Sequence, residues 1–181
     1  KILEVCRKKK LNTKIYNSTS TDCFGDQKKK CNEKTLFAPL SPYAKSKSFA
    51  YWIVKYYREF FNVSCVSGVV SNHESILRPE NFATKKIIYY AQKFKGKKKL
   101  IMGNTNVYRD WGWAPDFVDA IYKINNAKKR DDYIVSTGKS VSLDFIIKKV
   151  FSIFKINKKF YIKNNNKFKR VSEIKKVFCD N

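Results

Sequence analysis

The feature that most constrains the fold is a short valine-rich run, residues 63–70, which lies between two amphipathic segments, residues 43–61 and 81–94. A short apolar run of this kind is typical of a strand that is buried on both faces of a parallel sheet. Parallel strands need long crossover connections, usually helices, and both flanking segments place apolar residues at helical spacing. The sequence therefore predicts an α/β fold with a mostly parallel sheet.

The same alternation continues along the chain, and 181 residues are enough for one core. We expect a single α/β domain fragment over residues 1–181, without internal repeats. The apolar stripe of residues 43–61 should lie in the core, and Asp116 should cap a helix. The other predicted elements are the end of a helix at 1–10, strands at 13–18, 100–103, 133–136 and 160–163, and helices at 116–125, 142–154 and 171–178.

Tyr43 and Lys47 stand four positions apart at the start of the long amphipathic segment. Residues at this spacing share one helix face, so an ammonium group would lie near a phenol. A nearby positive charge favours the phenolate and lowers the tyrosine pKa, which suits a proton acceptor. The alternative is a plain surface helix, because the chain is rich in both residue types.

Polar segments follow two of the predicted strands. Residues 18–25 combine hydroxyl groups with Asp22, and residues 71–75 contain Asn72 and His73. In open α/β sheets, ligands bind beyond the carboxyl ends of the strands. Both segments are therefore candidate site regions, although the first, taken alone, is explained more simply by a Ser/Thr turn.

The charge of the chain raises the question of a nucleic-acid partner. Lysine and arginine number 39 against 15 aspartate and glutamate residues, a formal charge of +24. The lysines form many short groups rather than one stripe, and no nucleic-acid-binding motif accompanies them. The joint excess of Lys, Asn, Ile and Tyr is typical of an AT-rich coding sequence, so we expect no dedicated nucleic-acid binding.

The cysteines and the histidine limit the chemistry. The five cysteines are widely spaced and include no C-x-x-C pair, which favours reduced thiols in a cytoplasmic protein over a disulfide framework or a metal site. His73 is the single histidine, which excludes a zinc site built on several histidines. No apolar run reaches the length of a membrane span, and the start at Lys1 suggests a truncated N-terminus.

Several strings together resemble the GDP-mannose 4,6-dehydratases, a branch of the extended short-chain dehydrogenase/reductase family. The resemblance extends over nearly the whole chain, and the strings that contain Asn72 and Arg109 are specific to this branch. The strings are Ser-Pro-Tyr-Ala-Lys-Ser-Lys at 41–47, Tyr-Trp-Ile-Val at 51–54 with Tyr-Arg-Glu at 57–59, Asn-His-Glu-Ser at 72–75 with Arg78, the stretch 80–87, and Gly-Asn at 103–104 ahead of Arg-Asp-Trp-Gly at 109–112.

The resemblance implies a partial Rossmann-like, doubly wound parallel sheet with a small C-terminal substrate-binding region. It also implies four catalytic residues. Tyr43 would remove the proton of the sugar 4-hydroxyl while hydride passes to NADP, and Lys47 would lower the Tyr43 pKa and hold the nicotinamide ribose. Asp22 would take the acidified C5 proton, water would leave from C6, and Ser20 would hydrogen-bond the reacting oxygen. The product would be GDP-4-keto-6-deoxymannose, with the cofactor regenerated.

Other positions receive binding roles from the same resemblance. His73 and Arg78 would contact the NADP phosphates, where a guanidinium group suits a phosphate. Two alternatives stay open: His73 could be a satisfied core histidine, and Arg170 with Glu173 could be a solvated i,i+3 pair. The residues assigned to the GDP-mannose substrate are Asn72, Lys86, Arg109, Arg170 and Glu173.

Departures from the family pattern bear on activity. Ser20 and Asp22 stand where Thr and Glu are usual, Leu77 replaces an arginine, and Trp113 replaces a smaller or polar residue. Asp is one methylene shorter than Glu, so its oxygen would fall about 1 Å short of C5, a misplacement that can cost roughly 100-fold in rate. The glycine-rich phosphate-binding unit is also missing, because these residues contain no glycine cluster.

Two other functions stay open. One is a sibling nucleotide-sugar epimerase or reductase, and the other is a catalytically silent relative that acts as a partner subunit or binds polyanions. Family members assemble as dimers or tetramers, so the resemblance also implies a homo-oligomer. The widely spaced cysteines and the lack of a membrane-length apolar run predict a cytoplasmic location without membrane association.

We predict that the 181-residue chain alone binds NADP weakly, because it has no glycine-rich turn that would place the pyrophosphate on a helix N-terminus. Isothermal titration calorimetry of the isolated chain should show no saturable binding at micromolar NADP. A micromolar Kd would contradict this prediction.

Overall fold

The protein is represented by a computed structural model that describes residues 1–162, 165 and 173–180. A central sheet of three parallel strands has the order β1-β2-β6, with β1 at Ile15–Ser20, β2 at Cys65–Val70 and β6 at Tyr133–Val135. All of β2 is buried, as the valine-rich run predicted. The parallel sheet therefore forms around this valine-rich segment.

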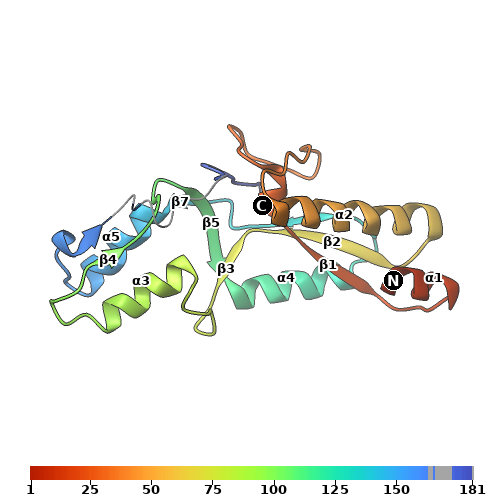
Figure 1. Cartoon of the computed structure of the whole chain (residues 1–181). Coiled ribbons are helices and arrows are strands. Elements are labelled where there is room, and N and C mark those ends of the chain that lie inside the picture. Colours follow the sequence, from red (N-terminus) through yellow and green to blue (C-terminus); the bar gives the residue numbers. More distant parts are fainter. Residues whose placement is uncertain (163–164, 166–172, 181) are drawn as a thin grey trace.

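Helices cover both faces of this sheet, which confirms the prediction of an α/β, Rossmann-like fold (Figure 1). α2 (Pro42–Phe61) lies on one face and α4 (Ala114–Asn126) on the other, while α1 (Ile2–Lys8) packs beside α2. No helix in the described part of the chain is long and apolar enough to cross a membrane. The buried residues of α2 recur at helical spacing, at Ala44, Ser48, Tyr51 and Val54.

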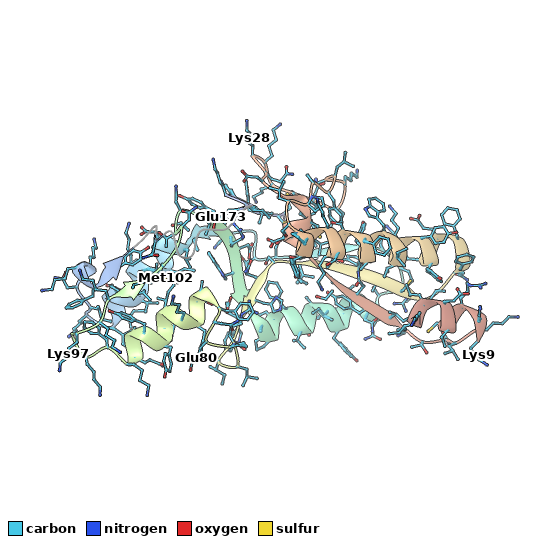
Figure 2. The ribbon with its side chains drawn as sticks, in the orientation of Figure 1. Lys9, Lys28, Glu80, Lys97, Met102 and Glu173 are labelled. Atoms are coloured by element: carbon cyan, nitrogen blue, oxygen red, sulfur yellow. The ribbon has the colours of Figure 1, made fainter. Side chains whose placement is uncertain are left out.

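The later part of the chain builds a second lobe. α3 (Ala83–Gln92) and α5 (Leu143–Ile153) pack against each other, and the short parallel pair β4 (Leu100–Ile101) and β8 (Tyr161–Ile162) belongs to the same lobe. Lys9 and Lys97 lie at opposite ends of the resulting elongated molecule (Figure 2). The core of this lobe includes Ile87, Leu100, Met102, Leu143, Ile147 and Phe151.

A small mixed sheet lies between the two lobes (Figure 1). β5 (Tyr108–Trp113) pairs in parallel with β3 (Asn72–Glu74) and antiparallel with β7 (Ser140–Ser142). The sequence did not predict these strands, because β3 and β7 have only three residues each and β5 shows no apolar alternation. The two 3-10 turns among the described residues are η1 (Thr21–Phe24) and η2 (Lys158–Phe160).

The expectation that the whole apolar stripe of α2 lies in the core is wrong. Phe49, Trp52, Tyr56 and Phe60 are exposed. The sheet contacts only one side of the helix, and smaller residues occupy most of that side. Helical periodicity therefore predicted the helix correctly but did not predict which of its faces is buried.

Two further expectations are also wrong. Asp116 lies in the first turn of α4 rather than at its N-cap, which is Trp113, because Pro115 suits the start of a helix.

Residues 173–178 form no helix, and residues 171–172 lie outside the described part of the chain. Instead, Lys176 forms an isolated β-bridge with Tyr108 of β5. The neighbouring side chains of Ile174 and Val177 are buried in a core cluster.

A buried ion pair joins α2 to the sheet. The Arg58 guanidinium donates to both carboxylate oxygens of Asp132, at 2.8 and 2.7 Å, and the two side chains are only 9% and 7% exposed. Asp132, which directly precedes β6, also accepts a hydrogen bond from Ser67 N of β2 at 3.1 Å. One carboxylate thus holds the helix and two strands together.

We predict that Asp132→Ala lowers the free energy of unfolding by about 3–5 kcal/mol, because the Arg58 charge stays buried without its partner. Urea unfolding followed by circular dichroism measures this loss. The matched control is Asp119→Ala, which removes the exposed partner of Lys123 and should cost less than about 1 kcal/mol. Equal losses in the two variants would contradict the prediction.

Candidate active site

The carboxyl end of β1 presents two of the predicted catalytic residues. Ser20 ends the strand and caps η1, where its Oγ accepts a hydrogen bond from Asp22 N at 3.2 Å. Gly25 follows the turn with a φ of 70°, and a Cβ at this position would lie 2.2 Å from Ala38 O, so the turn requires glycine. The turn leaves the Asp22 side chain 32% exposed at the edge of the sheet.

Tyr43 and Lys47 lie at the same edge, at the start of α2. Ser41 caps this helix and accepts a hydrogen bond from Ala44 N at 3.1 Å. Lys47 Nζ donates to Ser18 O of β1 at 2.8 Å and lies 5.9 Å from the centre of the Tyr43 ring. Because Tyr43 is 53% exposed, its ring is accessible to a ligand.

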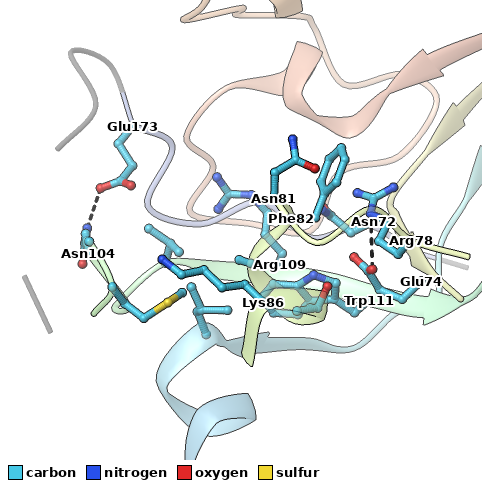
Figure 3. Close-up of a pocket in the computed structure, with 16 residues that line it drawn as sticks. Asn72, Glu74, Arg78, Asn81, Phe82, Lys86, Asn104, Arg109, Trp111 and Glu173 are labelled. Carbon is cyan, nitrogen blue, oxygen red and sulfur yellow. Dashed lines mark hydrogen bonds and ion pairs between the residues drawn. The ribbon is translucent and has the colours of Figure 1, made fainter. Parts of the chain in front are cut away.

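A cavity of about 340 Å³ opens beside β3, α3 and β5 (Figure 3). Its wall contains five residues to which the sequence assigned binding roles, and these come from well-separated parts of the chain. The fold, rather than any local motif, brings them together. The five residues are Asn72, Arg78, Lys86, Arg109 and Glu173.

Nearby acceptors hold the cationic side chains of the cavity wall. Lys86 Nζ donates to Ile101 O at 2.9 Å. Arg78 Nε lies 3.3 Å from a carboxylate oxygen of Glu74, and its guanidinium carbon lies 3.7 Å from the centre of the Phe82 ring. Three of the lining side chains are cationic and two are acidic, a balance that favours an anionic ligand.

Two polar groups in the wall point to a ligand with hydrogen-bonding atoms. Asn104 Nδ2 donates to Glu173 Oε2 at 2.6 Å, which places the Glu173 carboxylate at the cavity (Figure 3). The buried hydroxyl of Thr84 has no hydrogen-bond partner among the described residues. Because an unpaired buried hydroxyl costs free energy, a ligand that hydrogen-bonds it would be favoured.

Arg109 connects the cavity to the edge of the central sheet. Its Nε lies 3.9 Å from Asp22 Oδ1, and its side chain is only 12% exposed. The next residue, Asp110, is buried and accepts hydrogen bonds from Thr137 N, Thr137 Oγ1 and Ser71 Oγ at 2.9 to 3.1 Å. These bonds hold β5 in place. Because Arg109 of β5 contacts Asp22 and also lines the cavity, the predicted base Asp22 lies next to the cavity.

The structure places His73 apart from the cavity lining. His73 Nδ1 lies 3.0 Å from Ser71 O, and its ring packs against Phe117 with the centroids 5.3 Å apart. His73 is partly buried, and both the phosphate contact and the satisfied core histidine stay predictions. Arg170 lies outside the described residues.

Sequence reasoning gave no role to several other lining residues. Most of them have no local signal, because only the fold places them at the cavity. The spacing of Arg78 and Phe82, four positions apart, could have suggested their contact, and the Gly-Asn string could have suggested Asn104. The residues without a predicted role include Glu74, Asn81, Phe82, Thr84, Asn104 and Trp111.

Comparison with known proteins adds a family to this geometry. Residues 1–180 match the family model described as GDP-mannose 4,6 dehydratase. GDP-mannose 4,6 dehydratase 2 of Arabidopsis thaliana is 35% identical over 163 residues, which are 89% of this chain and 44% of the relative. The GDP-mannose 4,6 dehydratase of Homo sapiens is 34% identical over 167 residues, which are 91% of this chain and 45% of the relative. The chain therefore spans less than half the length of these two relatives.

Solved structures share the fold at low sequence identity. A dTDP-glucose 4,6-dehydratase from Bacillus anthracis, in complex with NAD, matches with a TM-score of 0.87 and 19% identity over 99% of this chain and 56% of that chain. A UDP-glucuronic acid 4-epimerase from Bacillus cereus matches with a TM-score of 0.84 and 21% identity over 99% of this chain and 56% of that chain. These two matches show the fold alone. The family match over residues 1–180 goes further, and the chain belongs to the GDP-mannose 4,6-dehydratase family.

Proposed function

We propose that this chain is the catalytic and substrate-binding part of an enzyme that converts GDP-mannose to GDP-4-keto-6-deoxymannose. The observation that carries the proposal is the cavity that contains Lys86, Arg109 and Glu173 and adjoins Asp22 through Arg109. A nucleotide sugar has a diphosphate between two hydrogen-bonding ends. A cavity with cations and flanking polar groups suits this chemistry.

The binding roles follow from the charge of each side chain. Arg109 and Lys86 would hold the diphosphate, the arginine through its planar fork and the lysine as a point charge. Asn72 would donate to the same group through its side-chain amide. The Glu173 carboxylate would accept hydrogen bonds from the nucleotide end.

The catalytic roles belong to the edge of the central sheet. Tyr43 would accept the proton of the sugar 4-hydroxyl, with Lys47 beside it at the start of the same helix. Ser20 would hydrogen-bond the reacting oxygen. Once C4 is a ketone, the C5 proton is acidic enough for Asp22 to remove, and water can leave from C6. Asp22 lies 3.9 Å from Arg109, which itself lines the cavity, and this contact would hold the carboxylate near the substrate.

The described residues fit only one end of the cofactor NADP. Lys47 and Tyr43 would flank its nicotinamide ribose, and Arg78 offers a guanidinium for a phosphate. When bound, NADP supplies the hydride acceptor for this class of reaction. No two of the six glycines stand three positions apart, so these residues offer no glycine-rich cradle for the pyrophosphate.

We predict that Arg109→Gln and Lys86→Gln each weaken binding of GDP-mannose to this chain by about 10- to 100-fold, because each removes a charge-assisted hydrogen bond. Isothermal titration calorimetry at constant salt measures the effect. The control is Lys123→Gln, which removes the same charge from an exposed lysine of α4 and should leave the affinity unchanged. Equal losses in all three variants would indicate nonspecific attraction and contradict the proposed site.

We predict turnover for a chimera that joins this chain to the part of the Arabidopsis thaliana relative that it does not match. With GDP-mannose and NADP, mass spectrometry should detect a product that is one water lighter than the substrate. Tyr43→Phe should abolish it. A product of unchanged mass would indicate an epimerase, and substrate binding without turnover would indicate a catalytically silent relative.

In the same chimera, we predict that Asp22→Glu raises turnover, by up to about 100-fold, because the longer side chain brings the carboxylate closer to C5. Asp22→Asn is the matched control, since it keeps the shorter length and removes the base. A rate that Asp22→Glu leaves unchanged would count against Asp22 as the base.

A further inference from the structure

Two cysteines that lie far apart in the sequence meet in the interior. Cys31 N donates a hydrogen bond to Phe178 O at 2.9 Å, and Asp180 N donates to Cys31 O at 2.9 Å. These bonds make Cys31 and Cys179 direct partners in a parallel β-bridge. Neighbouring strands lie about 4.7–4.9 Å apart, which falls within the range of about 4.4–6.8 Å between the Cα atoms of disulfide-bonded cysteines.

The environment of the pair decides which of the two thiols reacts first. Both residues are fully buried in one apolar cluster, which also contains Phe24 and Val177. The hydrogen bond between the thiols lowers the pKa of Cys31 and raises that of Cys179. Since the thiolate is the nucleophile in disulfide exchange, Cys31 is the attacking sulfur.

The other thiols are held differently. Cys23 Sγ donates to Ala44 O at 3.5 Å, and Cys65 Sγ donates to Val54 O at 3.3 Å, so each is bound to a helix carbonyl. Burial raises the pKa of Cys65 to about 11. Cys6 shares an apolar cluster with Cys65, but no β-bridge among the described residues pairs these two residues.

The pair joins two segments that border the candidate active site. Cys31 belongs to the loop that follows η1 and Asp22, and Cys179 belongs to the segment 173–180, which begins with Glu173 at the cavity. The same two segments are joined by hydrogen bonds from Lys176 N to Asp26 Oδ1 and from Gln27 N to Lys176 O. A covalent link between Cys31 and Cys179 would therefore tie this segment to the loop that follows Asp22.

We propose that Cys31 and Cys179 form a reversible disulfide when the protein meets a low-molecular-weight disulfide oxidant. The Cys31 thiolate attacks one sulfur of the oxidant, which forms a mixed disulfide and releases one thiol. The Cys179 sulfur, after losing its proton, then attacks the Cys31 sulfur and releases the second thiol. The protein loses two hydrogen atoms, and the oxidant is reduced to two thiols.

The test incubates the reduced, folded 181-residue chain with glutathione disulfide, followed by denaturation and alkylation of the remaining thiols. We expect three of the five cysteines to stay alkylatable, and peptide mapping should find one Cys31–Cys179 linked peptide. The oxidised form should unfold about 10 °C higher than the reduced form, because the cross-link closes a long loop. Dithiothreitol should reverse both effects.

Variants separate this pair from general oxidation. After oxidation, Cys31→Ala and Cys179→Ala should each leave all four remaining cysteines open to alkylation. Cys6→Ala, which removes another buried cysteine, should leave the cross-link intact. The wild-type measurement decides the matter even if a variant fails to fold. Five alkylatable thiols after oxidation, a different linked pair, or a stable mixed disulfide with glutathione would overturn the proposal.

Discussion

The parallel pairing of β1 with β2 is the constraint on which the rest of the structure depends. The two strands are in register from Ile15 with Cys65 to Ser20 with Val70, so both end at the same edge of the sheet. The turn that carries Asp22 follows β1, and Asn72 lies two residues beyond β2. Parallel strands must return by a crossover, and that crossover is α2, whose start carries Tyr43. Ser20, Asp22, Tyr43 and Asn72 therefore lie near one edge of the sheet because of the strand topology.

Buried carboxylates stabilise this arrangement from within. Asp132 joins α2 to β2 and the start of β6, and Asp110 joins β5 to the segments around Ser71 and Thr137. Each carboxylate satisfies several donors at once, which is the condition under which a buried charge is tolerated. By contrast, Asp22 remains partly exposed and has one ion pair with Arg109. The two fully satisfied groups serve the framework, while Asp22 stays available to a ligand.

The cavity has two sides that are built differently. Arg109 stands on β5 and Lys86 on α3, and both belong to regular elements of the fold. Glu173 belongs to a segment that is attached through backbone bridges, through the Lys176 contacts and through the burial of Ile174 and Val177. The proposed disulfide at Cys179 acts on this second side. Oxidation would thus affect the side of the cavity that lies outside the regular elements.

Local physics made much of this protein predictable from its sequence. The valine-rich run predicted a buried parallel strand, periodicity predicted α2 and α5, and the Tyr43/Lys47 spacing placed both residues at the start of one helix. These features depend on neighbours within a few positions, so short-range patterns contain them. The strings shared with the family also named most of the charged residues that line the cavity.

Only the tertiary structure decided the remaining features, because they depend on contacts between distant segments. The sheet covers one side of α2, which leaves Phe49 exposed although its spacing is that of a core residue. The pairing of Arg109 with Asp22 and of Cys31 with Cys179 required β5 and the chain end to pack against the loop after β1. Sequence alone determined the long elements, such as β2, α2 and α5, and the chemical groups that are present, whereas packing determined the small sheet β3-β5-β7 and which of those groups meet.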